Sequence, residues 1–345
     1  MAAGVGAAGA EPRVLPVADG GDGTLDVLLA TASGGWVEHH EVHGPDGQPL
    51  PARLGWLDPQ TAVVEMAEAA GLRLVQGDRL DAQGATSRGT GELIAAALDG
   101  GATRIIVGVG GGASTDGGAG ILQALGARLG DADGRDIQPG GAALLDLDRI
   151  DLIGLDRRLR VVRIRVAVDV RNPLLGPDGA ARVFAPQKGA GPEDVEVLEQ
   201  ALSHFVEVVE RDLGKRPLAD LPGAGAAGGC GFGLALIGAG LLPGAKLICD
   251  LVGLDAALEG ADLVLTGEGR LDSQTAAGKA PAEVAERAHR RGIPCIAIAG
   301  SVDDPPKGMF QSIWSLTDLA NGSDPHTNAA ELIREAARLA ASKRG

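Results

Sequence analysis

The chain is poor in aromatic side chains: Phe and Trp make up 2% of its 345 residues, and tyrosine is absent. Proteins that bind single-stranded nucleic acid usually stack bases on aromatic rings. The formal net charge of −15 would also repel a phosphate backbone. The composition therefore argues against a nucleic-acid partner. Hydrophobic residues still amount to 45%, which predicts a large core built mainly from Ala, Val, Leu and Ile.

Cysteine is also scarce, and the three cysteines are Cys230, Cys249 and Cys295. They are far apart and lack the spacing of metal ligands, so we expect reduced, packed thiols. Residues 1–10 contain no basic segment followed by a long apolar run, unlike a secretory signal. No apolar stretch reaches the roughly 18 residues that span a bilayer. The sequence therefore predicts a cytoplasmic protein without a membrane segment.

Strand-like and helix-like segments alternate along much of the chain. Runs at residues 36–42, 50–57 and 61–66 are separated by turn sequences and predict an antiparallel meander. The glycine-dense residues 222–233 predict a loop that is too flexible to belong to the core unless it contacts another part of the protein. Further strands are expected at residues 13–18, 104–109, 163–170, 262–266, 293–299 and 313–316, and helices at residues 91–99, 117–129, 191–214, 247–258 and 281–291.

This order is typical of an α/β fold with two domains. The alternation at both chain ends predicts a discontinuous, Rossmann-like parallel α/β/α domain made of residues 1–30 and 246–345. Residues 31–245 would form an inserted α/β domain with a mixed sheet and glycine-rich loops.

Three glycine-rich loops carry acidic side chains, at residues 17–24, 108–118 and 265–275. Glycine lets the backbone turn tightly and bring its N–H groups close to an anion. Neighbouring carboxylates would repel a bare phosphate unless a cation lies between them. Phosphate, Mg²⁺ and carboxylate in one site indicate phosphoryl transfer. The acidic residues concerned are Asp19, Asp22, Asp116, Glu268 and Asp272.

Two glycine patterns have other interpretations. Residues 108–113 fit G-x-G-x-x-A after an expected strand, with Asp131 further on, so a NAD-dependent dehydrogenase of a small hydroxy acid is an alternative. However, Asp131 lies in a Gly/Asp-rich loop and not at a strand end. Lys279 precedes an expected helix, where an anion is favoured, but Ala280 occupies the Ser/Thr position of a Walker A motif.

Six motifs resemble the type I glycerate kinases, which transfer the γ-phosphate of ATP to D-glycerate. They occur in family order and lie at residues 15–24, 108–120, 169–176, 184–189, 222–229 and 266–275. Family members usually begin with a strand and a loop resembling Ala-Pro-Asp-Ser-Phe-Lys-Gly-Ser. Here residues 1–12 resemble the end of the helix that follows. Either the start is misassigned or an edge of the sheet is lost, which leaves a truncated, non-catalytic remnant as a further alternative.

The resemblance implies ATP and Mg²⁺ as cofactors and D-glycerate as substrate. It favours 2-phosphoglycerate over 3-phosphoglycerate as product, in organic acid metabolism derived from glyoxylate; it does not predict an oligomeric state. The candidate catalytic residues are Asp116, Asp169 and Asp19. The candidate substrate-binding residues are Arg270, Lys188, Arg88, Glu268 and Asp272. The candidates for binding ATP are Gly110, Gly111, Gly112, Ala113, Gly225, Gly228, Gly229 and Lys279, and those for the metal are Asp19 and Glu268.

Overall fold

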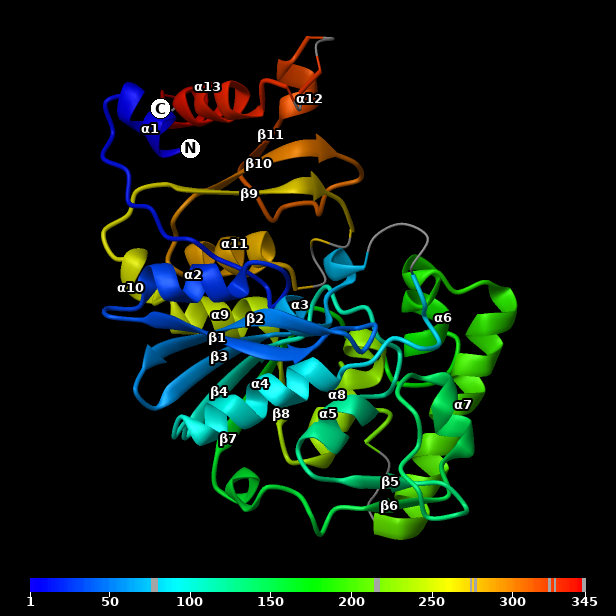
Figure 1. Ribbon diagram of the computed structural model, residues 1–345. Coiled ribbons are helices and arrows are strands. Elements are labelled where there is room, and N and C mark those ends of the chain that lie inside the picture. The colour runs from blue at the N-terminus through cyan, green and yellow to red at the C-terminus, as the bar shows by residue number, and fades with distance from the viewer. Residues whose placement is uncertain are drawn as a thin grey trace. The chain divides into compact units, whose positions relative to one another are not determined.

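The computed structural model of the chain describes residues 1–75, 80–213, 218–273, 275, 278–321, 324–325 and 327–342. The chain forms two compact units (Figure 1). The larger unit contains residues 19–244, and the smaller unit contains residues 1–18 and 245–345.

The described residues of the larger unit form a six-stranded mixed sheet in the order β1-β2-β3-β4-β7-β8. The first three strands are antiparallel neighbours, and β3, β4, β7 and β8 run parallel. A separate antiparallel pair joins β5 to β6. The strands are β1 (Trp36–His43), β2 (Pro49–Asp58), β3 (Thr61–Glu65), β4 (Arg104–Gly108), β5 (Arg128–Gly130), β6 (Arg149–Asp151), β7 (Arg163–Val168) and β8 (Gly240–Pro243).

Helices cover both faces of this sheet, with α4 on one face and α2 on the other (Figure 1). Side chains alternate along β2: Leu54 joins the core against α4, whereas Gly55 lies under Leu25 of α2. The α-helices are α2 (Thr24–Thr31), α3 (Met66–Ala70), α4 (Arg88–Asp99), α5 (Ala119–Ala124), α6 (Ala180–Phe184), α7 (Pro192–Leu213) and α8 (Ala226–Leu236). The 3₁₀ turns are η1 (Leu72–Leu74), η3 (Ala142–Asp146), η4 (Arg157–Arg160) and η5 (Pro186–Lys188).

The larger unit has two cores. One lies between the sheet, α4 and α8. The other surrounds α7, whose apolar stripe includes Leu198, Leu202 and Phe205. The period of 3.6 residues and Pro192 at the first helical position predicted this helix correctly. Gly214, where we expected the helix to end, lies outside the described residues.

The smaller unit has a three-layer α/β/α arrangement. Its described residues form a parallel three-stranded sheet in the order β11-β10-β9. Ile298 of β10 packs against α13 on one face, and Cys295 packs against α11 on the other. The elements are α1 (Ala2–Ala7), α9 (Gly244–Leu251), α10 (Leu254–Ala257), β9 (Val264–Leu271), α11 (Ala280–Arg290), β10 (Cys295–Val302), β11 (Ser312–Ser315), α12 (Leu316–Leu319) and α13 (Ala329–Ser342).

Three local predictions were wrong, each for a physical reason. Residues 13–18 form no strand, because Leu15 and Val17 pack on the cluster around Cys249 instead of pairing with a sheet. The helix expected over residues 117–129 is interrupted after α5 by Gly126, whose φ is +99°. The glycine-dense residues 222–233, expected to be a loop, include most of α8, because they contact the second loop: a Cβ at Gly228 would lie 2.1 Å from Ser114 O, and residues 227–229 have left-handed backbone angles there.

The boundary between the units also differs from the expected one. We expected residues 19–30 to belong with the chain ends, but they form part of the larger unit. Residues 19–30 belong to the larger unit because they contact the sheet of that unit. The N–H groups of Gly23 and Leu25 donate to the carboxylate of Glu65, and Leu25 packs against Gly55.

Among the described residues, no helix has both the length and the apolar character needed to cross a bilayer.

Candidate active site

The parallel strands of the larger unit end together at one edge of the sheet, at Glu65, Gly108, Val168 and Pro243. In α/β folds, ligands usually bind at the carboxyl ends of parallel strands. Asp169 directly follows β7 and is exposed at this edge. The loops that follow these strands are therefore the expected position of the site.

The first acidic loop lies across this edge. The Gly110 N–H donates to Gly20 O at 3.1 Å, which joins the first loop to the second. Gly20 has a φ of +101°, and a Cβ there would lie 2.7 Å from the Cβ of Ala167, so the position requires glycine. The half-buried carboxylate of Asp19 accepts a hydrogen bond from Gly21 N at 3.3 Å. Glycine thus brings Asp19 next to the end of β7.

The second loop packs closely on the first. A Cβ at Gly110 would lie 2.4 Å from Gly21 Cα, and one at Gly111 would lie 2.5 Å from Asp22 Oδ1. At Gly112 a Cβ would come within 2.8 Å of the Met66 side chain. The glycines at these positions permit the close approach of two acidic loops.

Several of the N–H groups that we expected to bind the phosphates of ATP already have acceptors within the protein. In addition to Gly110, Ala113 donates to Ala70 O at 2.8 Å, Gly225 to Asn172 O at 3.0 Å, and Gly229 to Gly225 O at 3.3 Å. In the structure these groups hold loops together. The role of Gly110–Gly112, Ala113, Gly225, Gly228 and Gly229 toward ATP stays a prediction.

Asp116 is buried, with 1% of its surface exposed. Its Oδ2 accepts from the backbone N–H and the hydroxyl of Ser87, both at 2.8 Å, and from Gly120 N at 3.2 Å. Its Oδ1 accepts from Gly118 N at 3.1 Å. This arrangement organises the second loop at the start of α5. The assignment of Asp116 as catalytic base stays a prediction, and its burial favours a positioning role.

Lys188 is the buried cation of this region, with 1% exposure. Its Nζ donates to Ser114 O at 2.5 Å, the one acceptor that it has among the described residues. Burial lowers the pKa of Lys188 to about 8, although the nearby Cys230 and Asp116 favour the charged form. Burial likewise raises the pKa of the Cys230 thiol to about 12. At neutral pH the site therefore holds a desolvated ammonium group with unused donors.

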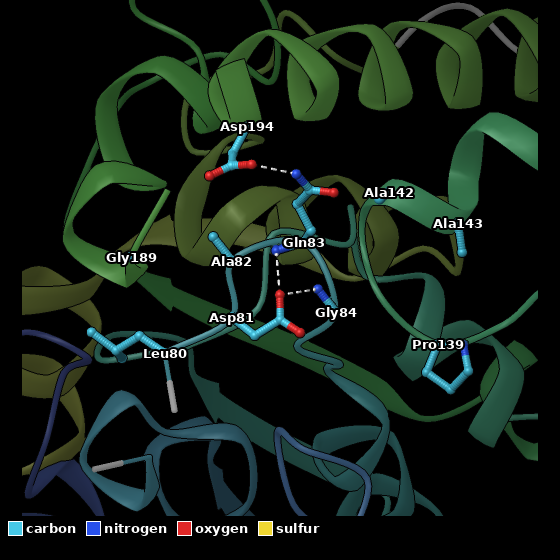
Figure 2. A pocket seen from close by; sticks show the side chains of 10 residues that line it. All are labelled: Leu80, Asp81, Ala82, Gln83, Gly84, Pro139, Ala142, Ala143, Gly189 and Asp194. Atoms are coloured by element: carbon cyan, nitrogen blue, oxygen red, sulfur yellow. Dashed lines mark hydrogen bonds between the residues drawn. The ribbon is translucent and has the colours of Figure 1, made fainter. Parts of the chain in front are cut away.

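A pocket of about 190 Å³ lies beside Lys188 and is also lined by Ala113, Asp46 and Asp81. It shares Leu80, Asp81 and Gly84 with a second pocket of about 390 Å³ (Figure 2). The smaller volume is below the usual range for drug-sized ligands, about 300–1,000 Å³, and suits a small molecule.

Hydrogen bonds hold the shared wall of the two pockets in place (Figure 2). The Asp81 carboxylate accepts from Gln83 N at 3.1 Å and from Gly84 N at 2.8 Å. The Gln83 side chain donates to Asp194 at 2.5 Å, which ties this segment to the first turn of α7. The wall next to Lys188 is therefore preorganised.

Arg88 lies in the first turn of α4 but not among these pocket residues. Its Nε is 3.0 Å from Glu92 Oε1, and 40% of its side chain is exposed. The expected role of Arg88 in substrate binding stays a prediction.

The third acidic loop belongs to the smaller unit, where it forms its own cluster. The half-buried Glu268 accepts from Thr275 Oγ1 at 2.5 Å and lies 3.5 Å from Lys279 Nζ. Arg270 lies 2.7 Å from Asp303 and 3.4 Å from Asp272. The structure therefore brings Glu268 and Lys279 together and pairs Arg270 with Asp272. Gln274 in this loop lies outside the described residues.

No group of three or more His, Cys, Asp or Glu side chains in the described part of the chain is arranged to hold a metal ion by itself. The carboxylates of Glu65 and Asp116 are occupied by the hydrogen bonds given above, which leaves Asp19 as the candidate ligand in the larger unit. Asp22 is paired with Arg73 at 2.9 Å.

The dinucleotide-binding interpretation of residues 108–113 is not supported by the local geometry. That fingerprint needs a helix that opens at the glycines, so that the pyrophosphate lies at its N-terminus. Here α5 begins only at Ala119, after a loop that packs on residues 20–22.

Glu65 was missed by the sequence analysis. The signal was present: a buried run, Ala62–Val64, ends in a glutamate at the carboxyl end of a strand. We regarded residues 61–66 only as part of a meander. The partners of Glu65 lie 40 and 42 residues away, so local reasoning did not find them.

Comparisons with known proteins agree with this fold. A model of the glycerate kinase family matches residues 1–343. A Bacillus subtilis glycerate kinase is 48% identical over 97% of this chain and 89% of its own length. An Escherichia coli glycerate 2-kinase is 48% identical over 84% of this chain and 76% of its own length. A solved structure described as glycerate kinase 2 from Salmonella typhimurium LT2 has a TM-score of 0.83 and 44% identity, covering 99% of this chain and 94% of that one.

The fold, the acidic glycine loops and these matches define a phosphotransferase that uses an alcohol group as acceptor. The chain belongs to the glycerate kinase family.

Proposed function

We propose that this protein transfers the γ-phosphoryl group of ATP to D-glycerate and forms 2-phosphoglycerate in preference to 3-phosphoglycerate. The observation that carries this proposal is the buried ammonium group of Lys188 beside a pocket of about 190 Å³. The preference for the 2-position is supported by the E. coli relative, which is described as a glycerate 2-kinase. The same proposal includes a role for this enzyme in the metabolism of organic acids derived from glyoxylate.

Lys188 would bind the carboxylate of D-glycerate. An ammonium group has three donors, and Ser114 O takes one of them. A charge-assisted hydrogen bond is stronger in a buried site, because water does not compete for the donor. Asp81 and Gly84 line the pocket beside Lys188 and are fixed by their mutual hydrogen bond, which would limit the motion of a small acid and favour alignment of its hydroxyl group.

Asp169 is the preferred candidate for accepting the hydroxyl proton, because it is exposed at the carboxyl edge of the sheet. Asp19 fits a magnesium ligand: it is a carboxylate, its loop follows the same edge, and Mg²⁺ in kinases is usually held by one or two carboxylates together with the phosphates. When bound, Mg²⁺ and ATP supply the phosphoryl group and neutralise its charge. Glu268, Arg270, Asp272 and Lys279 keep their predicted roles toward metal, substrate and nucleotide.

A cytoplasmic location is part of this proposal. Cys230, Cys249 and Cys295 are buried free thiols, which is the usual state in a reducing compartment.

An ADP-release assay with D-glycerate and L-glycerate tests the proposed function. We expect ATP- and Mg²⁺-dependent turnover with D-glycerate and at least tenfold lower kcat/KM with L-glycerate. Phosphorus NMR of the product should show 2-phosphoglycerate. Turnover of neither acid would contradict the proposal, whereas 3-phosphoglycerate as the product would overturn only the position of transfer.

The pH dependence of KM tests the role of Lys188. Its pKa in the folded protein is lowered to about 8, so the substrate-free site loses its positive charge as the pH rises above this value. D-Glycerate stays ionised throughout this range. We therefore expect the KM for D-glycerate to be flat below pH 8 and to rise about tenfold per pH unit above it. The KM for ATP serves as the control; a KM for D-glycerate that is constant to pH 9.5 would contradict this role.

A further inference from the structure

Glu65 is a buried carboxylate, 1% exposed, at the end of β3. Its Oε1 accepts from Gly23 N at 2.9 Å, and its Oε2 accepts from Leu25 N at 2.8 Å. Both donors belong to the N-terminus of α2, since Gly23 is the N-cap of this helix. A charge far away in the sequence therefore binds the positive end of the helix.

This contact changes what the first glycine loop can bind. A glycine-rich loop that leads into a helix normally presents its N–H groups to a phosphate. Here the carboxylate of Glu65 takes the place that an anion would occupy. Of the two carboxylates in the loop, Asp22 is paired with Arg73, so Asp19 is the group that is left for a ligand, and a carboxylate attracts a cation.

The same residue also links the two acidic loops of the larger unit. Glu65 pairs with Gly108 across β3 and β4, at the point where the second loop begins. The first loop is further held by Gly110 N on Gly20 O and by the Thr24 hydroxyl, which donates to Gly21 O at 2.7 Å. Only Glu65 among these groups brings a negative charge to the N-terminus of α2.

We propose that Glu65 is a positioning residue that holds the Asp19–Asp22 loop in a form that faces the metal ion of metal–ATP and not its phosphates. The inference rests on the proposed function for its kinetic part. Neither nearby arginine has Glu65 as its partner: Arg73 pairs with Asp22, and Arg53 pairs with Glu68. The specific contribution of Glu65 is therefore the position of the loop.

Glu65→Gln is the test, because it keeps the shape of the side chain but places an amide N–H₂ against a backbone N–H. We expect kcat to fall at least tenfold, while the KM for D-glycerate stays within twofold because the pocket beside Lys188 is separate from this loop. Calorimetric titration with Mn²⁺·ATP, without glycerate, should show at least fivefold weaker binding than wild type.

Asp212→Asn is the matched control. Asp212 is also a carboxylate with little exposure that accepts a backbone N–H from a distant segment, Ile150 N at 2.9 Å, but it lies outside the candidate site. We expect it to change the thermal midpoint only, with kcat, KM and Mn²⁺·ATP affinity unchanged.

If Glu65→Gln lowers the thermal midpoint but leaves kcat and Mn²⁺·ATP affinity at the values of the control, Glu65 is merely structural and the inference fails. Should Glu65→Gln not fold, Glu65→Asp keeps the charge with a shorter reach, and an unchanged kcat and affinity there would also overturn the inference. A wild-type protein that binds Mn²⁺·ATP but does not phosphorylate D-glycerate would contradict the proposed function alone, since the titration still tests Glu65.

Discussion

Replacing Lys188 with methionine is expected to raise the KM for D-glycerate at least a hundredfold without destabilising the fold. A hundredfold loss corresponds to about 2.7 kcal/mol, which is within the range of hydrogen bonds to charged groups in buried sites. Methionine has a similar length and needs no desolvation of a charge, which offsets the loss of the hydrogen bond to Ser114 O, so we expect little net change in stability. The hydrogen bonds from Ser87, Gly118 and Gly120 still satisfy the carboxylate of Asp116.

The measurement is the ADP-release assay together with a thermal melt. Lys307→Met, which removes an exposed lysine, is the control and should alter neither quantity. A Lys188→Met protein that keeps the wild-type KM would show that the carboxylate binds elsewhere. Loss of the folded state in this variant would show that the ammonium is needed for stability instead.

Replacing Arg287 with methionine is expected to have the opposite effect: a large loss of stability with little change in the KM of the folded protein. Only 2% of the Arg287 side chain is exposed. Its guanidinium lies 2.7 Å from Glu283, 2.8 Å from Asp255 and 2.7 Å from Asp250. Asp250 and Asp255 are about half exposed, but removal of Arg287 leaves the mostly buried Glu283, 14% exposed, without its cation, which costs about 3 kcal/mol.

This loss in the free energy of unfolding is measured by urea unfolding of the full chain, monitored with a signal that reports on the smaller unit. Arg338→Met is the matched control, because Arg338 also lies in the smaller unit, is 41% exposed and lies 2.6 Å from Glu335. An exposed pair of this kind contributes at most about 1 kcal/mol. If the free energy of unfolding changes equally in the two variants, the buried Arg287 side chain contributes no more than an exposed arginine, and the prediction is wrong.

Much of the fold was predictable where a local pattern has one structural meaning. The regular apolar spacing after Pro192 predicted α7, and the turn-separated runs between residues 36 and 66 predicted β1, β2 and β3. The prediction failed where a distant contact decides the conformation. Residues 227–229 all adopt left-handed backbone angles within α8, and the chain there approaches Ser114 so closely that a Cβ at Gly228 would lie 2.1 Å from the Ser114 oxygen.

The candidate site was predictable in its residue types but not in its contacts. Asp19 and Lys188 stand out because they occur in glycine-containing motifs that resemble a known family. Which of the acidic residues are buried was not visible in the sequence. Asp116 and Glu65 are both buried, whereas Asp169 is exposed at the sheet edge.

The sequence by itself determined the α/β class, the family and the three acidic loops, because these depend on residue order and spacing. Only the tertiary structure decided that Glu65 binds the N-terminus of α2 and that Lys188 is buried beside a small pocket. The physical reason is that hydrogen bonding and desolvation depend on distances between residues that are far apart in the chain. Those distances exist only once the strands have paired and the loops have packed.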